Sequence, residues 1–265
     1  MASALHVVQS QVEASLRLPA PFGIRPRPTP ELLPTGVPAL DQLTGGLPRG
    51  ALTEICGGLS SGRTSVLHAL LARATAAGEA CALIDASGAF DPRSAQSAGA
   101  DLNRLLWVRG DPERINRLKR DPGAHVDQAL KTADLLLQAG GFGLVVIDLA
   151  DVPPRIARRV PLTSWFRFRR AVESTRTVLL VIEQEAFAKN SASLVLRLEA
   201  VFHHGDTETQ RESEKNNSRF SLSPRLRCEQ DSPFCHDVRA DIERWHLRKP
   251  SRSARFRLTA PEEVA

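Results

Sequence analysis

The segment Gly57-Gly58-Leu59-Ser60-Ser61-Gly62-Arg63-Thr64-Ser65 has the spacing of a loop that binds phosphate. Glycines at its first and sixth positions permit a tight turn, so that successive N–H groups and the following helix N-terminus point at an anion. The Thr64 hydroxyl is placed for Mg²⁺. Arg63 stands where the motif has lysine. Its planar guanidinium cannot occupy the same place beside the terminal phosphates as a compact ammonium group. The loop therefore predicts weak binding of ATP or another nucleoside triphosphate with Mg²⁺, with impaired hydrolysis.

Asp148 is a second candidate, because it ends the apolar run 144–147. A carboxylate at the carboxyl edge of a parallel sheet is placed to hold the Mg²⁺ shell of a bound nucleotide. A buried strand that ends in aspartate is also common in proteins without such a site. Beside the phosphate loop, however, Thr64 and Asp148 form the expected pair of metal-shell residues.

A third group mixes arginine with aromatic residues and permits two interpretations. It comprises Arg155, Arg158, Arg159, Trp165, Phe166, Arg167, Phe168, Arg169 and Arg170. Guanidinium groups and aromatic planes together can bind single-stranded DNA by charge and stacking. Alternatively, an amphipathic helix buries Trp165, Phe168 and Val172 and leaves the arginines in water.

The elements that must position these residues follow from the alternation of apolar runs and helical patterns. Buried strands are predicted at 51–56, 81–85, 104–109, 143–148 and 177–183. Helices are predicted at about 62–77, 91–99, 125–139 and 163–175. This order predicts an α/β fold with a largely parallel sheet, right-handed crossovers and helices on both faces.

The rest of the chain divides around that core. We expect an N-terminal helix and proline-rich linker (1–32), the nucleotide-binding core (33–204), a polar, disordered insertion (205–237), and a closing hairpin with a tail (238–265). The alternating run 194–202 predicts a half-buried strand that begins an antiparallel part of the sheet. The runs 242–248 and 254–258 predict an antiparallel hairpin.

Composition excludes several classes of protein. With 265 residues, 42% hydrophobic residues and a net charge of +5, the chain can bury a core, and it contains no apolar run of membrane-spanning length. The N-terminus lacks the order of a signal peptide, and four cysteines are too few for a disulfide framework. We expect a cytoplasmic protein with no membrane partner and no zinc cluster at Cys228, Cys235 and His236.

Several segments resemble the ATPase core of the bacterial RecA recombinases: LPTG, ALD, GGLPRG, GGLSSGRTS and CALIDASGAFDP. The stretch RRVPLTSWFRFRRAVESTRTVLLVIEQ more closely resembles the ImuA-like group, RecA relatives encoded with error-prone polymerase cassettes. The resemblance covers 33–202 and the hairpin, and it implies a RecA-like P-loop fold and a role in DNA repair and SOS (translesion) mutagenesis. It implies a translesion polymerase or a RecA-type protein as partner, with single-stranded DNA as a further ligand and homo-oligomers formed through residues 1–20.

The resemblance also assigns site residues. Asp91 matches the family's adenine-contacting aspartate, and Gln184 matches the glutamine that senses the terminal phosphate. Ser87 stands where the family has the glutamate that polarises the attacking water, and Ser94 stands where it has the aromatic that stacks on adenine. These departures imply an accessory protein with a degenerate ATPase. The alternatives are an active DNA-dependent ATPase of homologous recombination and an interaction module that needs no nucleotide.

Overall fold

The computed structural model describes residues 31–110, 123–201, 237–245 and 253–257, all of them within one compact unit that begins at Glu31. The predicted N-terminal helix lies outside the described residues. So does the predicted insertion at 205–237, except for Asp237, which begins a strand. Cys228, Cys235 and His236 also lie outside the described residues. In the described part, no helix is long and apolar enough to cross a membrane.

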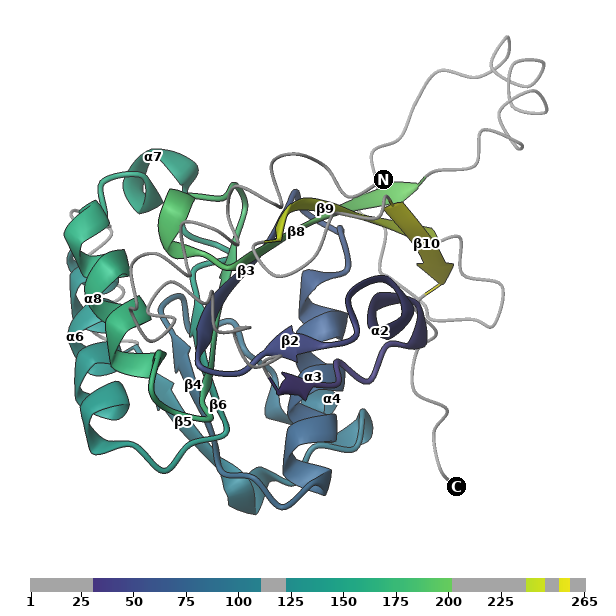
Figure 1. Cartoon of the computed structure of the whole chain (residues 1–265), viewed down its shortest axis with the longest axis horizontal. Helices are drawn as coiled ribbons and strands as arrows, with labels where there is room; N and C mark the ends of the chain where they lie inside the picture. The colour runs from purple at the N-terminus through teal and green to yellow at the C-terminus, as the bar shows by residue number, and fades with distance from the viewer. Residues whose placement is uncertain (1–30, 111–122, 202–236, 246–252, 258–265) are drawn as a thin grey trace, which may run out of the picture. The chain divides into compact units, whose positions relative to one another are not determined.

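An eight-stranded sheet forms the centre of the fold, in the order β10-β9-β8-β3-β7-β6-β4-β5 (Figure 1). Its strands are β3 (Ala51–Gly57), β4 (Cys81–Asp85), β5 (Leu105–Arg109), β6 (Leu144–Asp148), β7 (Val178–Glu183), β8 (Leu194–Val201), β9 (Asp237–Trp245) and β10 (Ser253–Arg257). A short pair, β1 (Leu32–Leu33) and β2 (Leu47–Pro48), lies apart from this sheet. The five strands predicted from apolar runs are all present.

The six strands from β8 to β5 are parallel. Of the described strands in this sheet, β9 alone runs against them, because β10 pairs antiparallel with β9 and so returns to their direction. The predicted strand at 194–202 is β8, and the antiparallel part of the sheet begins there, because β8 pairs antiparallel with β9. On its other side β8 pairs parallel with β3 and places Cys56 opposite Arg197. Alternation along β8 reflects which face is covered and carries no information about strand direction. The predicted antiparallel hairpin is confirmed.

Helices cover both faces of the sheet. They are α2 (Pro38–Thr44), α3 (Arg63–Ala76), α4 (Pro92–Ser97), α6 (Gly123–Ala139), α7 (Pro154–Ala157) and α8 (Leu162–Val172), with short 3-10 turns at Leu102–Arg104 and Lys189–Ser191. One apolar core joins α2 and α3 to residues such as Ile55 and Leu180. A second core joins α6 and α8 to Leu52 and Val181 on the opposite face. Figure 1 shows α6 and α8 side by side on that face.

Candidate nucleotide site at the carboxyl edge of the sheet

The phosphate loop leaves the end of β3 and enters α3. Gly57 is the last residue of the strand, and a Cβ there would lie only 2.3 Å from the main-chain oxygen of Leu198. Gly62, immediately before α3, has φ of 87°, and Ser60 also lies in the left-handed region with φ of 58°. A side chain at position 57 would displace β8, so glycine is required there. The loop thus has the context that the motif predicted.

Donors inside the loop fit an anion. The Ser61 side chain is buried, and its Oγ atom has no hydrogen-bond partner among the described residues. The N–H groups in the first turn of α3 precede any intrahelical acceptor. Thr64 and Ser65 are exposed at this end of the helix. Because a buried hydroxyl without a partner is unfavourable, this arrangement suits a phosphate group. The role of Thr64 as a Mg²⁺ ligand stays a prediction.

Arg63 points its guanidinium at the sheet. Its Nη1 atom donates to the main-chain oxygen of Glu183 at 2.6 Å and to that of Ala150 at 3.5 Å. Burial lowers the pKa of Arg63, and the negative charges of Asp148 and Asp151 oppose that shift. Arg63, which replaces the lysine of the motif, therefore forms its hydrogen bonds with the ends of β6 and β7.

Gln184 donates a hydrogen bond to the main-chain oxygen of Ala150, which also accepts from Arg63. Its Nε2 atom donates to the oxygen of Ala150 at 3.0 Å and to that of Val152 at 3.4 Å. The turn after β6 is thus held from two sides, by the first residue of α3 and by the first residue after β7. Movement of Gln184 would release this turn, which is compatible with the predicted sensing role.

Asp148 is half-buried at the end of β6, where its Oδ1 atom accepts from the N–H of Ala150 at 2.9 Å. Burial, aided by the charges of Asp85 and Asp151, raises the pKa of Asp148 to about 6. The hydrogen bond from Ala150 and the charge of Arg63 act in the opposite direction. A bound cation would favour the ionised carboxylate, as the chemistry of Mg²⁺ ligands requires.

Sequence reasoning missed two carboxylates at this edge. Asp85 ends β4 opposite Asp148, and it accepts from the N–H groups of residues 88, 89 and 90. Ser87 Oγ lies 3.4 Å from both Asp85 Oδ1 and Asp151 Oδ2. Asp85 could have been recognised from the same sequence pattern as Asp148, because it also ends an apolar strand. Asp151 had no such pattern, because only folding brings residues 87 and 151 together.

Asp91 caps a helix. Its carboxylate accepts from the N–H groups of Arg93 and Ser94, at 3.1 and 3.2 Å, and from the Ser94 hydroxyl at 2.5 Å. The Ser94 hydroxyl is the main cause that lowers the pKa of Asp91. This arrangement fixes the start of α4. Contact between Asp91 and adenine stays a prediction.

Two buried carboxyl groups lie beside the site, on the face covered by α8. Glu54 Oε1 accepts from the N–H groups of Phe187 and Ala188, at 2.8 and 2.6 Å. Its other oxygen and both oxygens of Glu183 have no other hydrogen-bond donor among the described residues. Burial raises the pKa of Glu183 well above its usual value, and the adjacent Glu54 raises it further. We infer that the pair holds a proton at neutral pH, because one protonated carboxyl can donate to the other.

The arginine and aromatic segment divides between core and surface. Trp165 and Phe168 are fully buried, as the amphipathic-helix interpretation predicts, while Phe166 is 47% exposed. Arg158 pairs with Glu185, and Arg167 pairs with Asp134 across to α6. Further exposed arginines near α7 and α8 form no ion pair among the described residues: Arg155, Arg159 and Arg170. Arg169 donates to the main-chain oxygen of Asn190.

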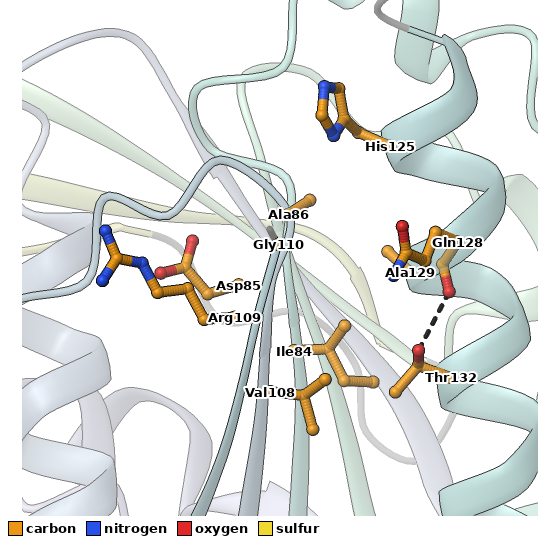
Figure 2. A pocket seen from close by; sticks show the side chains of 10 residues that line it. All are labelled: Ile84, Asp85, Ala86, Val108, Arg109, Gly110, His125, Gln128, Ala129 and Thr132. Atoms are coloured by element: carbon orange, nitrogen blue, oxygen red, sulfur yellow. Dashed lines mark hydrogen bonds between the residues drawn. The ribbon is translucent and has the colours of Figure 1, made fainter. Parts of the chain in front are cut away.

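A small hollow lies beside this edge, between α6 and the ends of β4 and β5 (Figure 2). Figure 2 shows Asp85 and Arg109 on one side and His125, Gln128 and Thr132 of α6 on the other. No residue of the phosphate loop lines it. Among the described residues, no group of histidine, cysteine and acidic side chains could hold a metal ion by itself.

Fold and loop together define an α/β protein of the P-loop type. The RecA N-terminal domain family model matches residues 22–157, about half of the chain, and the chain belongs to this family. Protein RecA of Mycobacterium marinum is 38% identical over 161 residues, which are 57% of this chain and 42% of that protein. Protein RecA of Cutibacterium acnes is 41% identical over 126 residues, or 46% and 32% of the two chains.

The chain therefore spans less than half the length of these relatives. A solved structure, the RadB recombinase, matches with a TM-score of 0.54 and 18% identity over 87% of this chain and 97% of that one. This likeness confirms the predicted fold.

Proposed function

We propose that this chain is a RecA-family accessory protein of DNA repair and SOS (translesion) mutagenesis, which binds Mg²⁺-nucleotide weakly and hydrolyses it poorly. Binding is supported by the loop backbone, by the exposed Thr64 and by the Ser61 hydroxyl, which has no hydrogen-bond partner in the described part of the chain. Mg²⁺, held by Thr64 and Asp148, would neutralise charge that develops on the phosphates.

The hydrogen bond from Arg63 to the oxygen of Glu183 carries the proposal of poor hydrolysis. A cation at the end of a phosphate loop accelerates hydrolysis by stabilising charge on the terminal phosphate. Arg63 is buried against the sheet, and Ser87 is not a base at neutral pH. Both features oppose turnover at the rates of a recombinase.

The proposed partners are a translesion polymerase or a RecA-type protein, with single-stranded DNA as a weak, sequence-independent ligand. Exposed guanidinium groups at Arg155, Arg159 and Arg170 support the DNA contact. Homo-oligomers formed through residues 1–20 and a cytoplasmic location complete the proposal. The ImuA-like character of the chain rests on the segment 158–184.

A paired measurement tests the proposal. Binding of a fluorescent triphosphate in Mg²⁺ is titrated first, and release of inorganic phosphate is then followed with and without single-stranded DNA. We expect weak binding and slow hydrolysis. DNA-stimulated turnover at a recombinase rate would identify an active ATPase, and absence of nucleotide binding would identify a nucleotide-independent interaction protein.

A further inference from the structure

Hydrolysis of a triphosphate at this edge requires a group that accepts a proton from water. Such a group must be ionised, reached by solvent and free of strong partners. Most carboxylates near the loop fail this test. Asp85 is 1% exposed and is saturated by N–H donors, including Trp107 Nε1 at 3.3 Å. Glu183 is fully buried beside Glu54.

The remaining candidates divide clearly. Asp148 is half-buried, bonded to Ala150 and placed for the cation, and Asp91 caps α4. Glu185 forms an ion pair with Arg158 at 3.0 Å. Asp151 is exposed, and its one hydrogen-bond contact among the described residues is a long one from Ser87 Oγ, 3.4 Å from Oδ2. It is therefore the carboxylate at this edge with the weakest competing partners.

Asp151 also lies beside three residues of the candidate nucleotide site: Arg63, Asp148 and Gln184. It directly follows Ala150, whose main-chain oxygen accepts from both Arg63 and Gln184. Its charge acts on both Arg63 and Asp148. The Ser87 hydroxyl holds it from the loop after β4, so Asp151 stands between the ends of the neighbouring strands β4 and β6.

We propose that Asp151 accepts the proton of the attacking water in the slow hydrolysis that this chain carries out. This inference rests on the proposed function, because it presumes that a triphosphate binds. The water oxygen forms a bond to the γ-phosphorus, and the bond from that phosphorus to the β–γ bridging oxygen breaks. The electron pair leaves on the nucleoside diphosphate. The water proton moves to Asp151 Oδ2 and then to solvent, and inorganic phosphate is released.

The primary test compares wild type with Asp151→Asn under single-turnover conditions, using radiolabelled ATP and excess protein. We expect wild type to release phosphate slowly but above the protein-free rate, and the variant to lose about 100-fold, or all detectable turnover. Glu173→Gln is the matched control, because Glu173 is an exposed acid beyond the end of α8. Its rate should equal that of wild type.

Two further variants separate chemistry from folding. Ser87→Glu in the Asp151→Asn background returns a carboxylate to the same place and should restore turnover. Asp151→Asn should also bind a non-hydrolysable triphosphate about threefold more tightly than wild type, because it removes a negative charge near the phosphates. The unfolding midpoint of each variant should match that of wild type.

The outcomes are distinguishable. If the triphosphate binds but wild type releases no phosphate, or Asp151→Asn releases it at the wild-type rate, the role of Asp151 is refuted and the accessory function stands. If no triphosphate binds, the proposed function fails and the inference fails with it. Loss of turnover in Asp151→Asn with recovery by Ser87→Glu supports both.

Discussion

The Nη1 atom of Arg63 lies 2.6 Å from the main-chain oxygen of Glu183, so that the first residue of α3 is tied to the last residue of β7. A charged donor on a buried acceptor is among the stronger hydrogen bonds in proteins. The residue in the lysine place of the loop therefore acts on the stability of the sheet. Affinity for nucleotide and stability of the fold are expected to oppose one another at this position.

Arg63→Lys should separate these two effects. The shorter ammonium leaves the oxygen of Glu183 and can reach a terminal phosphate, so triphosphate affinity should rise about tenfold. Stability should fall by about 1–2 kcal/mol, because a buried acceptor loses its donor. A nucleotide titration and a urea unfolding curve measure the two effects. Arg73→Lys, at an exposed position near the end of α3, should change neither. Equal affinity for Arg63→Lys and wild type would contradict this account.

Glu183→Gln should stabilise the protein at neutral and alkaline pH. Because the folded-state pKa of Glu183 is raised, the native state binds more protons than the unfolded chain, and stability falls as pH increases above the ordinary value of 4.5. Glutamine is neutral and can donate an N–H group to Glu54. Urea unfolding between pH 5 and 9 should give a steeper decline for wild type than for the variant. Glu173→Gln is the control, and parallel curves for Glu183→Gln and wild type would refute the prediction.

Binding of Mg²⁺-nucleotide should strengthen as pH rises through about 6. Asp148 must be ionised to hold a cation, and burial raises its pKa to about 6. Asp148→Asn should bind weakly at every pH and lose this dependence. His68→Gln is the control, because His68 is a second titratable group whose pKa burial lowers from the ordinary value of 6.5. A pH-independent affinity in wild type would show that Asp148 takes no part.

Reversal of the arginines that precede α8 should abolish binding of single-stranded DNA. The triple substitution of Arg155, Arg158 and Arg159 by glutamate replaces exposed positive charge with negative charge. The affinity of wild type for DNA should fall steeply as the salt concentration rises, because binding releases counterions from the phosphates. Fluorescence anisotropy of a labelled oligonucleotide measures both. A triple reversal at Arg73, Arg93 and Lys131 controls for net charge. If both triple variants lose affinity equally, the segment has no special role.

Trp165→Ala tests the other half of the same segment. Because the indole is fully buried, we expect a loss of about 3–5 kcal/mol in unfolding free energy. Folded molecules of the variant should keep wild-type DNA affinity, since the ring cannot stack on a base. Reduced affinity with unchanged stability would instead place the ring at the DNA interface.

Strand and helix order could be predicted from the sequence, because apolar runs and helical periods are local signals. The phosphate loop and Asp148 were recognised for the same reason. The antiparallel pairing that begins at β8 was predicted, but its parallel pairing with β3 was not, since a strand has the same alternation in either direction. Asp151 and the pair Glu54–Glu183 depend on contacts between distant segments, and no pattern along the chain signals such contacts.

Trp107 provides an intrinsic optical probe of the site. Its Nε1 atom donates to Asp85, its ring packs 5.4 Å from that of Phe90, and the Arg109 guanidinium lies 5.6 Å from its centre. Asp85 anchors residues 88–90, so any ligand that shifts this loop changes the surroundings of the indole. Trp165, sealed in the core, supplies a constant background emission. In a Trp245→Phe protein, binding of an unlabelled ligand is therefore expected to shift the wavelength of the tryptophan emission maximum.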